Sequence, residues 1–197
     1  MVYIRQMVDK TVTIEHICEA LLEGRNTEAK KIARNQYPFQ PLFKKRRNYS
    51  LHQSMQVFVR DGFIDRYSGQ RLIFPGVLRL LSIFLPDEFP FQKNWKMTET
   101  HIAYWELYPT IDHVVPIARG GNDDKSNWVT TSMLRNTAKS NWTLSELGWV
   151  LLQPGKMTAW DGFTYLFLDF IDSNSAILND TYIKRWHRAA IGALEKT

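Results

Sequence analysis

The chain has 197 residues, of which 44% are hydrophobic and 13% aromatic, enough to fill a real core. Its formal charge of +5 and pI of about 9.3 suit a polyanionic partner without identifying one. A single cysteine, Cys18, excludes an internal disulfide framework and fits a reducing cytoplasm. No secretory signal is visible, and Arg79 interrupts the longest apolar stretch, residues 77–85. We therefore expect a cytoplasmic protein that does not span a membrane.

The N-terminal region predicts two short helices. Residues 14–22 have the apolar spacing of a helix, with Thr13 as a candidate N-cap and Gly24 at the end. A second helix is expected around residues 29–34, with its basic side chains exposed. The pair could be a hairpin packed on the core, which we favour, or a helix-turn-helix that reads DNA.

A basic run follows two prolines in residues 37–41. It consists of Lys44, Lys45, Arg46 and Arg47. Such runs are usually solvated, but beside a polyanion this one could contact phosphate. Residues 51–59 are predicted to be helical.

Residues 69–108 form a long segment with several prolines and many aromatic residues. We interpret these aromatics as core, with Trp95 or Trp105 as the alternative, a platform for an exposed base. His101 precedes the next predicted strand and lacks a ligand-like set of neighbours, so we treat it as structural.

Residues 110–115 are rich in β-branched side chains and predict a strand. Residues 118–126 are a loop by composition, and residues 128–131 predict a short second strand. Ser132 can cap a helix that runs to about Asn141.

The C-terminal region predicts two further helices, at residues 158–171 and 179–194. Both carry large apolar and aromatic side chains, including Phe167 and Trp186. We interpret this apolar stripe as core or as a seam between subunits.

The residues around the predicted strand–loop–strand carry the chemistry. Asp112 and Asn136 offer a charged and a neutral oxygen, which suits Mg²⁺, an ion that takes one or two protein oxygens and keeps several waters. His113 is the usual general base near neutral pH. Together these residue types supply what metal-assisted hydrolysis needs.

Two geometric expectations follow from these positions. Asn136 and Lys139 are three residues apart on the predicted helix and share a face, so Lys139 could touch a phosphate near the metal. Adjacent side chains on a regular strand point to opposite faces. Asp112 and His113 can therefore serve one site only if the strand is irregular or ends there, which Pro116 favours.

The run TIDHVVPIARGGNDDKSNWVTTSMLRNTAKSNW, residues 110–142, resembles the HNH family of metal-dependent nucleases. His113, Asn127 and Asn136 are separated by 14 and 9 residues, with Asn as the third letter. In that family two strands and a helix hold one divalent cation against a phosphodiester. The resemblance implies that His113 is the general base and that Asp112 and Asn136 bind the metal. It implies a mainly structural role for Asn127, which would tie the loop to the strand and steady the histidine.

Many HNH proteins also carry two Cys-x-x-Cys pairs that bind a structural zinc. In the matching run RDGFIDRYSG, Asp65 and Ser68 stand at the first pair of positions, and Ser132 and Arg135 stand at the second. Structural zinc normally needs four Cys or His ligands, so no zinc is expected. The two halves should still lie close together, which predicts a salt bridge between Asp65 and Arg135.

We therefore predict an α+β fold with a ββα-metal HNH centre embedded in a mostly helical shell. Residues 1–50 would form a helical hairpin and basic segment, 51–145 the nuclease core, and 146–197 helices packed on that core, unless all form one domain. The predicted function is DNA cleavage by an endonuclease with one Mg²⁺ or Mn²⁺ per centre, in restriction, phage defence or mobile-element biology. Double-strand breaks would favour a homodimer or sequential nicks.

Two other functions stay open at this point. The chain could be a non-catalytic nucleic-acid-binding module on an HNH scaffold, or it could be an RNA nuclease. In each case, contacts to nucleic acid are expected from Lys139, Arg119 and the basic run at residues 44–47.

Overall fold

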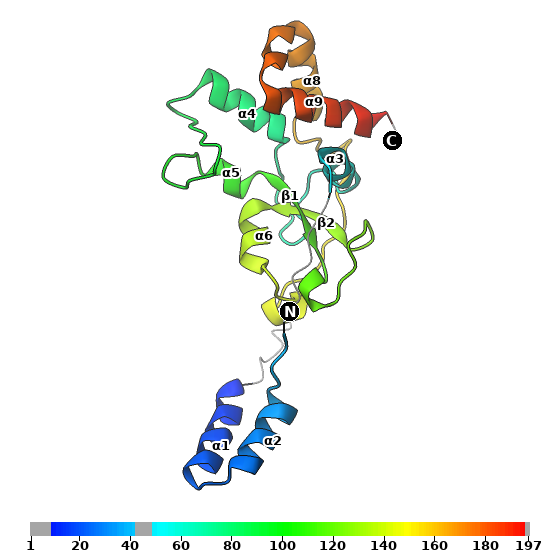
Figure 1. Cartoon of the computed structure of the whole chain (residues 1–197). Coiled ribbons are helices and arrows are strands. Elements are labelled where there is room, and N and C mark those ends of the chain that lie inside the picture. The colour runs from blue at the N-terminus through cyan, green and yellow to red at the C-terminus, as the bar shows by residue number, and fades with distance from the viewer. Residues whose placement is uncertain (1–8, 42–48, 196–197) are drawn as a thin grey trace. The chain divides into compact units, whose positions relative to one another are not determined.

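The computed structural model of the chain describes residues 9–41 and 49–195 (Figure 1). The chain divides into two compact units, Met1–Lys44 and Lys45–Thr197. Within the described residues, helices predominate and one antiparallel sheet has two strands, so the expected α+β class is confirmed. No helix in this part of the chain is long and apolar enough to cross a bilayer.

The first unit contains α1 (Lys10–Leu22) and α2 (Asn26–Gln36), which lie side by side (Figure 1). The prediction of two helices is confirmed, but Thr13 is not the cap. The N-cap is Asp9, one turn before Thr13. Its carboxylate accepts a hydrogen bond from the Thr11 amide at 2.9 Å and so satisfies one of the free N–H groups at the start of the helix. The basic run at residues 44–47 lies outside the described residues. The choice between a packed hairpin and a DNA-reading pair stays a prediction.

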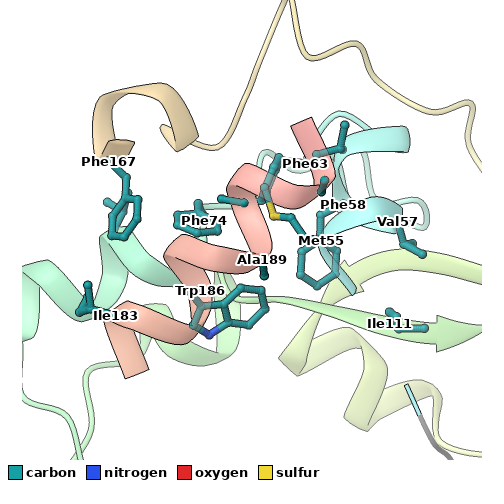
Figure 2. Packing of buried hydrophobic residues seen from close by; sticks show 14 of the residues in the cluster. Met55, Val57, Phe58, Phe63, Phe74, Ile111, Phe167, Ile183, Trp186 and Ala189 are labelled. Atoms are coloured by element: carbon teal, nitrogen blue, oxygen red, sulfur yellow. The ribbon is translucent and has the colours of Figure 1, made fainter. Parts of the chain in front are cut away.

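In the second unit, α3 (Leu51–Arg60) begins with a capping box. The Gln53 amide donates to Ser50 Oγ, and the Gln53 side chain accepts from the Ser50 amide. This helix packs against α9 (Thr181–Leu194), and the rings of Phe58 and Trp186 stack there with centroids 6.2 Å apart (Figure 2). The main core of the unit forms around this contact.

Two more helices extend the core, α4 (Pro75–Phe84) and α8 (Thr164–Ser173). Phe74, just before α4, meets Phe167 of α8 edge to face at 4.9 Å. The predicted start of the last-but-one helix at residue 158 was wrong, because Gly162 and Phe163 have φ values of 65° and 64°. A right-handed helix cannot continue through two left-handed residues, so α8 begins after them.

Two strands and a helix follow one another directly. β1 (Pro109–His113) pairs antiparallel with β2 (Trp128–Ser132), and α6 (Met133–Lys139) begins at the next residue and packs against both strands (Figure 1). The predicted cap is confirmed, since Ser132 Oγ accepts from the Arg135 amide at 3.2 Å. Ser140 has a φ of 47°, so the helix ends at Lys139, earlier than predicted. The remaining short elements are α5 (Ala103–Glu106), η1 (Ile117–Arg119), α7 (Leu144–Leu147) and η2 (Ser175–Asn179).

Candidate active site

Asp112 and Lys139 meet between β1 and α6. Lys139 is the last residue of α6, and its side chain is fully buried rather than solvated. Its Nζ lies 2.8 Å from Asp112 Oδ2 and donates to the His113 carbonyl oxygen at 2.8 Å. The predicted contact between Lys139 and phosphate stays a prediction; in this structure the ammonium is paired inside the protein.

Tyr67 is the third member of this cluster. Its hydroxyl donates to Asp112 Oδ2 at 2.6 Å, and its ring lies 5.8 Å from the Lys139 ammonium. Burial, and then the charge of Asp112, raises the pKa of Tyr67 well above its ordinary value of 10. The phenol therefore stays protonated and acts as a donor to the carboxylate. Nothing in the local pattern around Tyr67 points to Asp112, which is 45 residues away along the chain.

His113 ends β1 and has a separate set of partners. Its Nε2 lies 2.8 Å from Asp123 Oδ1, and the Trp128 indole nitrogen lies 2.9 Å from Nε2 and 3.0 Å from the same carboxylate oxygen. An indole nitrogen can only donate, and a carboxylate can only accept. All three groups are satisfied when Asp123 accepts from both rings, which puts the imidazole proton on Nε2.

This arrangement leaves Nδ1 of His113 with a lone pair. Nδ1 is buried and has no hydrogen-bond partner among the residues that the structure describes. Most buried polar atoms are paired, so the unpaired Nδ1 of His113, like the buried Nε of Arg119, is an exception that calls for an explanation. The sequence pattern singled out His113 but not Asp123, its orienting partner.

Asn127 ties the loop after β1 to the strand end. Its Oδ1 accepts from the Val115 amide at 2.9 Å, and its Nδ2 donates to the carbonyl oxygens of Val115 and Asn122. Gly121 lies inside the same turn, where an added Cβ would fall 1.9 Å from the Val115 carbonyl oxygen. Any other residue at 121 would push the loop away from the strand, whereas Gly120 is favoured by its φ of 89°.

Asn136 faces β1 from the middle of α6. Its Nδ2 donates to Thr110 Oγ1 at 2.9 Å and to the Ile111 carbonyl oxygen at 3.0 Å. A carbonyl oxygen only accepts, so these contacts turn the amide nitrogen toward the strand and leave Oδ1 on the other branch of the side chain. Asn136 and Lys139, three residues apart, both reach β1, as the helical spacing predicts.

The residue types at Asp112 and Asn136 suit a hard divalent cation. Asp112 would contribute a carboxylate and Asn136 an amide oxygen, and Mg²⁺ takes one or two such oxygens while keeping several waters. Over residues 9–41 and 49–195, no group of three or more His, Cys, Asp or Glu side chains could hold a metal. A cation at Asp112 would therefore have few protein ligands and would depend on water and substrate oxygens.

Two other buried carboxylates hold β2 against the run RDGFIDRYSG. One of them, Asp65, accepts through Oδ2 from Thr131 Oγ1 at 3.0 Å and from the Ser132 amide at 2.9 Å, and its Oδ1 accepts from the amides of Tyr67 and Ser68. Arg135 Nε lies 3.8 Å away, so the predicted salt bridge is confirmed as a long ion pair. The predicted convergence of the two halves is therefore real, but hydrogen bonds carry most of it.

Asp61 is the other carboxylate, and the sequence pattern did not single it out. Its side chain accepts from the Thr130 amide at 2.8 Å and from the guanidinium groups of Arg60 and Arg66. The spacing of four residues between Asp61 and Asp65, with an arginine directly after the second, was a signal that could have been used.

The remaining candidates have intramolecular partners. Arg119 donates to Glu146 at 3.0 Å and lies over the Trp142 ring. Trp95 packs edge to face on Trp105 at 5.7 Å, in a cluster that also contains Tyr104 and Tyr108. His101 stacks on Phe89 at 4.1 Å and accepts from the Ala103 amide. These contacts give each side chain a structural role.

Comparison with known proteins gives no family: no protein-family model, no curated protein and no solved structure matches this chain.

Proposed function

We propose that the second unit is a divalent-metal-dependent endonuclease that hydrolyses phosphodiester bonds in DNA, with a ββα-metal centre of the HNH type. The observation that carries the proposal is the pair of oriented groups at β1. Asp112 meets α6 through Lys139 and is followed directly by His113, whose Nε2 is held by Asp123. β1, β2 and α6 follow one another in the order that the sequence resemblance implies, which supports the proposal.

His113 is the proposed general base. With Nε2–H donated to Asp123, the Nδ1 lone pair can take a proton from an attacking water. The oxygen of that water bonds to phosphorus, the bond from phosphorus to the 3′ oxygen breaks, and that oxygen leaves to take up a proton. Asp123 then stabilises the imidazolium through the same hydrogen bond, much as an orienting carboxylate does in other catalytic pairs.

Asp112 and Asn136 are the proposed ligands for Mg²⁺ or Mn²⁺. A bound divalent cation supplies Lewis-acid stabilisation of the charge that develops on the phosphoryl and leaving oxygens. The protein's share is to fix the two oxygens, through Tyr67 on Asp112 and through the strand contacts of Asn136. Asn127 and Gly121 hold the strand end that carries His113.

A plasmid cleavage assay tests this function. Supercoiled DNA should be nicked or linearised with Mg²⁺ or Mn²⁺ and stay intact with EDTA, and the products should carry 5′-phosphates. A single-stranded RNA of the same sequence, tested in parallel, separates a DNA enzyme from an RNA nuclease. Absence of metal-dependent cleavage of both substrates, by protein shown to be folded, would contradict the proposal.

A non-catalytic nucleic-acid-binding module is the second candidate. The burial of His113 and the pairing of Asp112 with Lys139 favour it, because both groups already have partners inside the protein. The formal charge of +5 supports nucleic-acid binding in either case. Salt-dependent DNA binding without any cleavage would support this second function.

A further inference from the structure

Lys139 is placed where a solvated lysine would not be expected. Its side chain is fully buried, and its ammonium lies 2.8 Å from both Asp112 Oδ2 and the His113 carbonyl oxygen. Removing an ammonium from water costs several kcal/mol unless an opposite charge and further hydrogen bonds compensate. Here the compensating charge is the carboxylate of Asp112, which is the proposed metal ligand.

The neighbours of Asp112 compensate the negative charge of its carboxylate. Lys139 and Asp112 together carry no net charge, and Tyr67 adds a neutral donor on the same Oδ2. The ammonium also donates to the His113 carbonyl oxygen, so two oxygens of β1 surround the positive charge. A cationic side chain is therefore built into the protein beside this carboxylate.

We infer that Lys139 is a built-in countercharge of Asp112, neutralising that carboxylate and competing with a divalent cation for it. The inference rests on the proposed function, because it concerns the same ligand. Two positive groups beside one carboxylate repel each other, so the free protein should bind metal weakly. A substrate phosphate brings a second negative charge, which can accept the ammonium and relieve that repulsion.

The test replaces Lys139 and measures metal binding without substrate. In Lys139→Met, removal of the charge should tighten Mn²⁺ binding by about 10-fold or more, measured by isothermal titration calorimetry on the full chain. Lys96→Met is the matched control, since Lys96 forms an exposed ion pair with Glu99 and should leave the affinity unchanged.

Thermal denaturation gives a second readout that does not depend on activity. In EDTA, Lys139→Met should melt about 10 °C below the wild type, because Asp112 is left buried and unpaired. Mn²⁺ should restore much of this loss, since it replaces the missing positive charge. The double variant Asp112→Asn/Lys139→Met should melt above Lys139→Met in EDTA and should not respond to Mn²⁺.

The outcomes separate this inference from the proposed function. Equal Mn²⁺ affinity in the wild type and Lys139→Met, abolished in both by Asp112→Asn, would overturn the inference and leave the metal site standing. Mn²⁺ binding that is absent or insensitive to Asp112→Asn would contradict the proposed metal site itself. If Lys139→Met is unfolded in EDTA, recovery of the fold on titration with Mn²⁺ supports the inference, and failure to recover overturns it.

Discussion

The two carboxylates that anchor β2 and the carboxylate on β1 are held in different ways. Asp61 and Asp65 accept hydrogen bonds from backbone amides of β2, which cannot move without moving the strand. Asp112 instead meets the Tyr67 hydroxyl and the Lys139 ammonium, both at the ends of side chains. Side-chain partners can rotate away, whereas backbone partners cannot. This difference is the one expected if Asp61 and Asp65 hold the fold and Asp112, as we propose, exchanges its Lys139 partner for a cation.

The largest expected effect is on catalysis. His113→Ala should lower the cleavage rate by about 10²–10⁴-fold, because general-base loss typically costs that much, while DNA binding survives on the basic surface. Plasmid nicking at saturating Mn²⁺ and a gel-shift assay measure the two properties. His16→Ala, on the exposed face of α1, is the control. A wild-type rate in His113→Ala would remove His113 from the chemistry.

The next effect is on stability and concerns the structural side of the comparison. Asp65→Ala should lower the free energy of unfolding by about 3–5 kcal/mol, because it leaves buried donors from both halves of the contact without an acceptor. Urea denaturation measures this change. Asp87→Ala at an exposed position serves as the reference. A loss below about 1 kcal/mol would mean that the two halves hold together without this carboxylate.

A matched pair of substitutions tests the comparison directly. Asp112→Asn and Asp65→Asn each remove one buried negative charge and keep the side chain's shape. Mn²⁺ should raise the melting temperature of the wild type and of Asp65→Asn but not of Asp112→Asn, since ligand binding stabilises the state that binds it. An Mn²⁺ response that persists in Asp112→Asn would place the cation elsewhere.

The smallest effect is expected at Tyr67. Tyr67→Phe removes one hydrogen bond to Asp112 and keeps the ring packed, so stability should fall by about 1 kcal/mol. The Mn²⁺ affinity should change less than in Lys139→Met, because a neutral donor is lost rather than a charge. A larger change in affinity than that of Lys139→Met would make the phenol, rather than the ammonium, the main partner of the carboxylate.

Local patterns predicted the elements that carry the site with good boundaries. The β-branched runs at residues 110–115 and 128–131 and the cap at Ser132 depend on neighbours within a few positions, and the structure contains both strands and the cap. The same kind of reasoning failed at residues 158–163. There, two left-handed residues precede α8, and the apolar pattern alone does not reveal them.

In the candidate site, too, some features could be predicted from the local sequence and others could not. The order and spacing of Asp112, His113, Asn127 and Asn136 were readable, because they lie within one short segment of chain. Their partners were less readable. Asp61 contacts a strand 69 residues later, and Tyr67 contacts Asp112 across 45 residues.

The sequence by itself determined which functional groups lie in the strand–loop–strand–helix segment: a carboxylate, an imidazole and two amides. Only the tertiary structure decided which charged and hydrogen-bonding partners these groups have. The Lys139 ammonium is packed inward against Asp112, and the His113 ring contacts Asp123, whereas Asn127, which the resemblance gave the role of steadying the histidine, holds the loop at Val115. The physical reason is that burial and charge pairing depend on which segments fold against each other. No pattern of nearby residues specifies that choice.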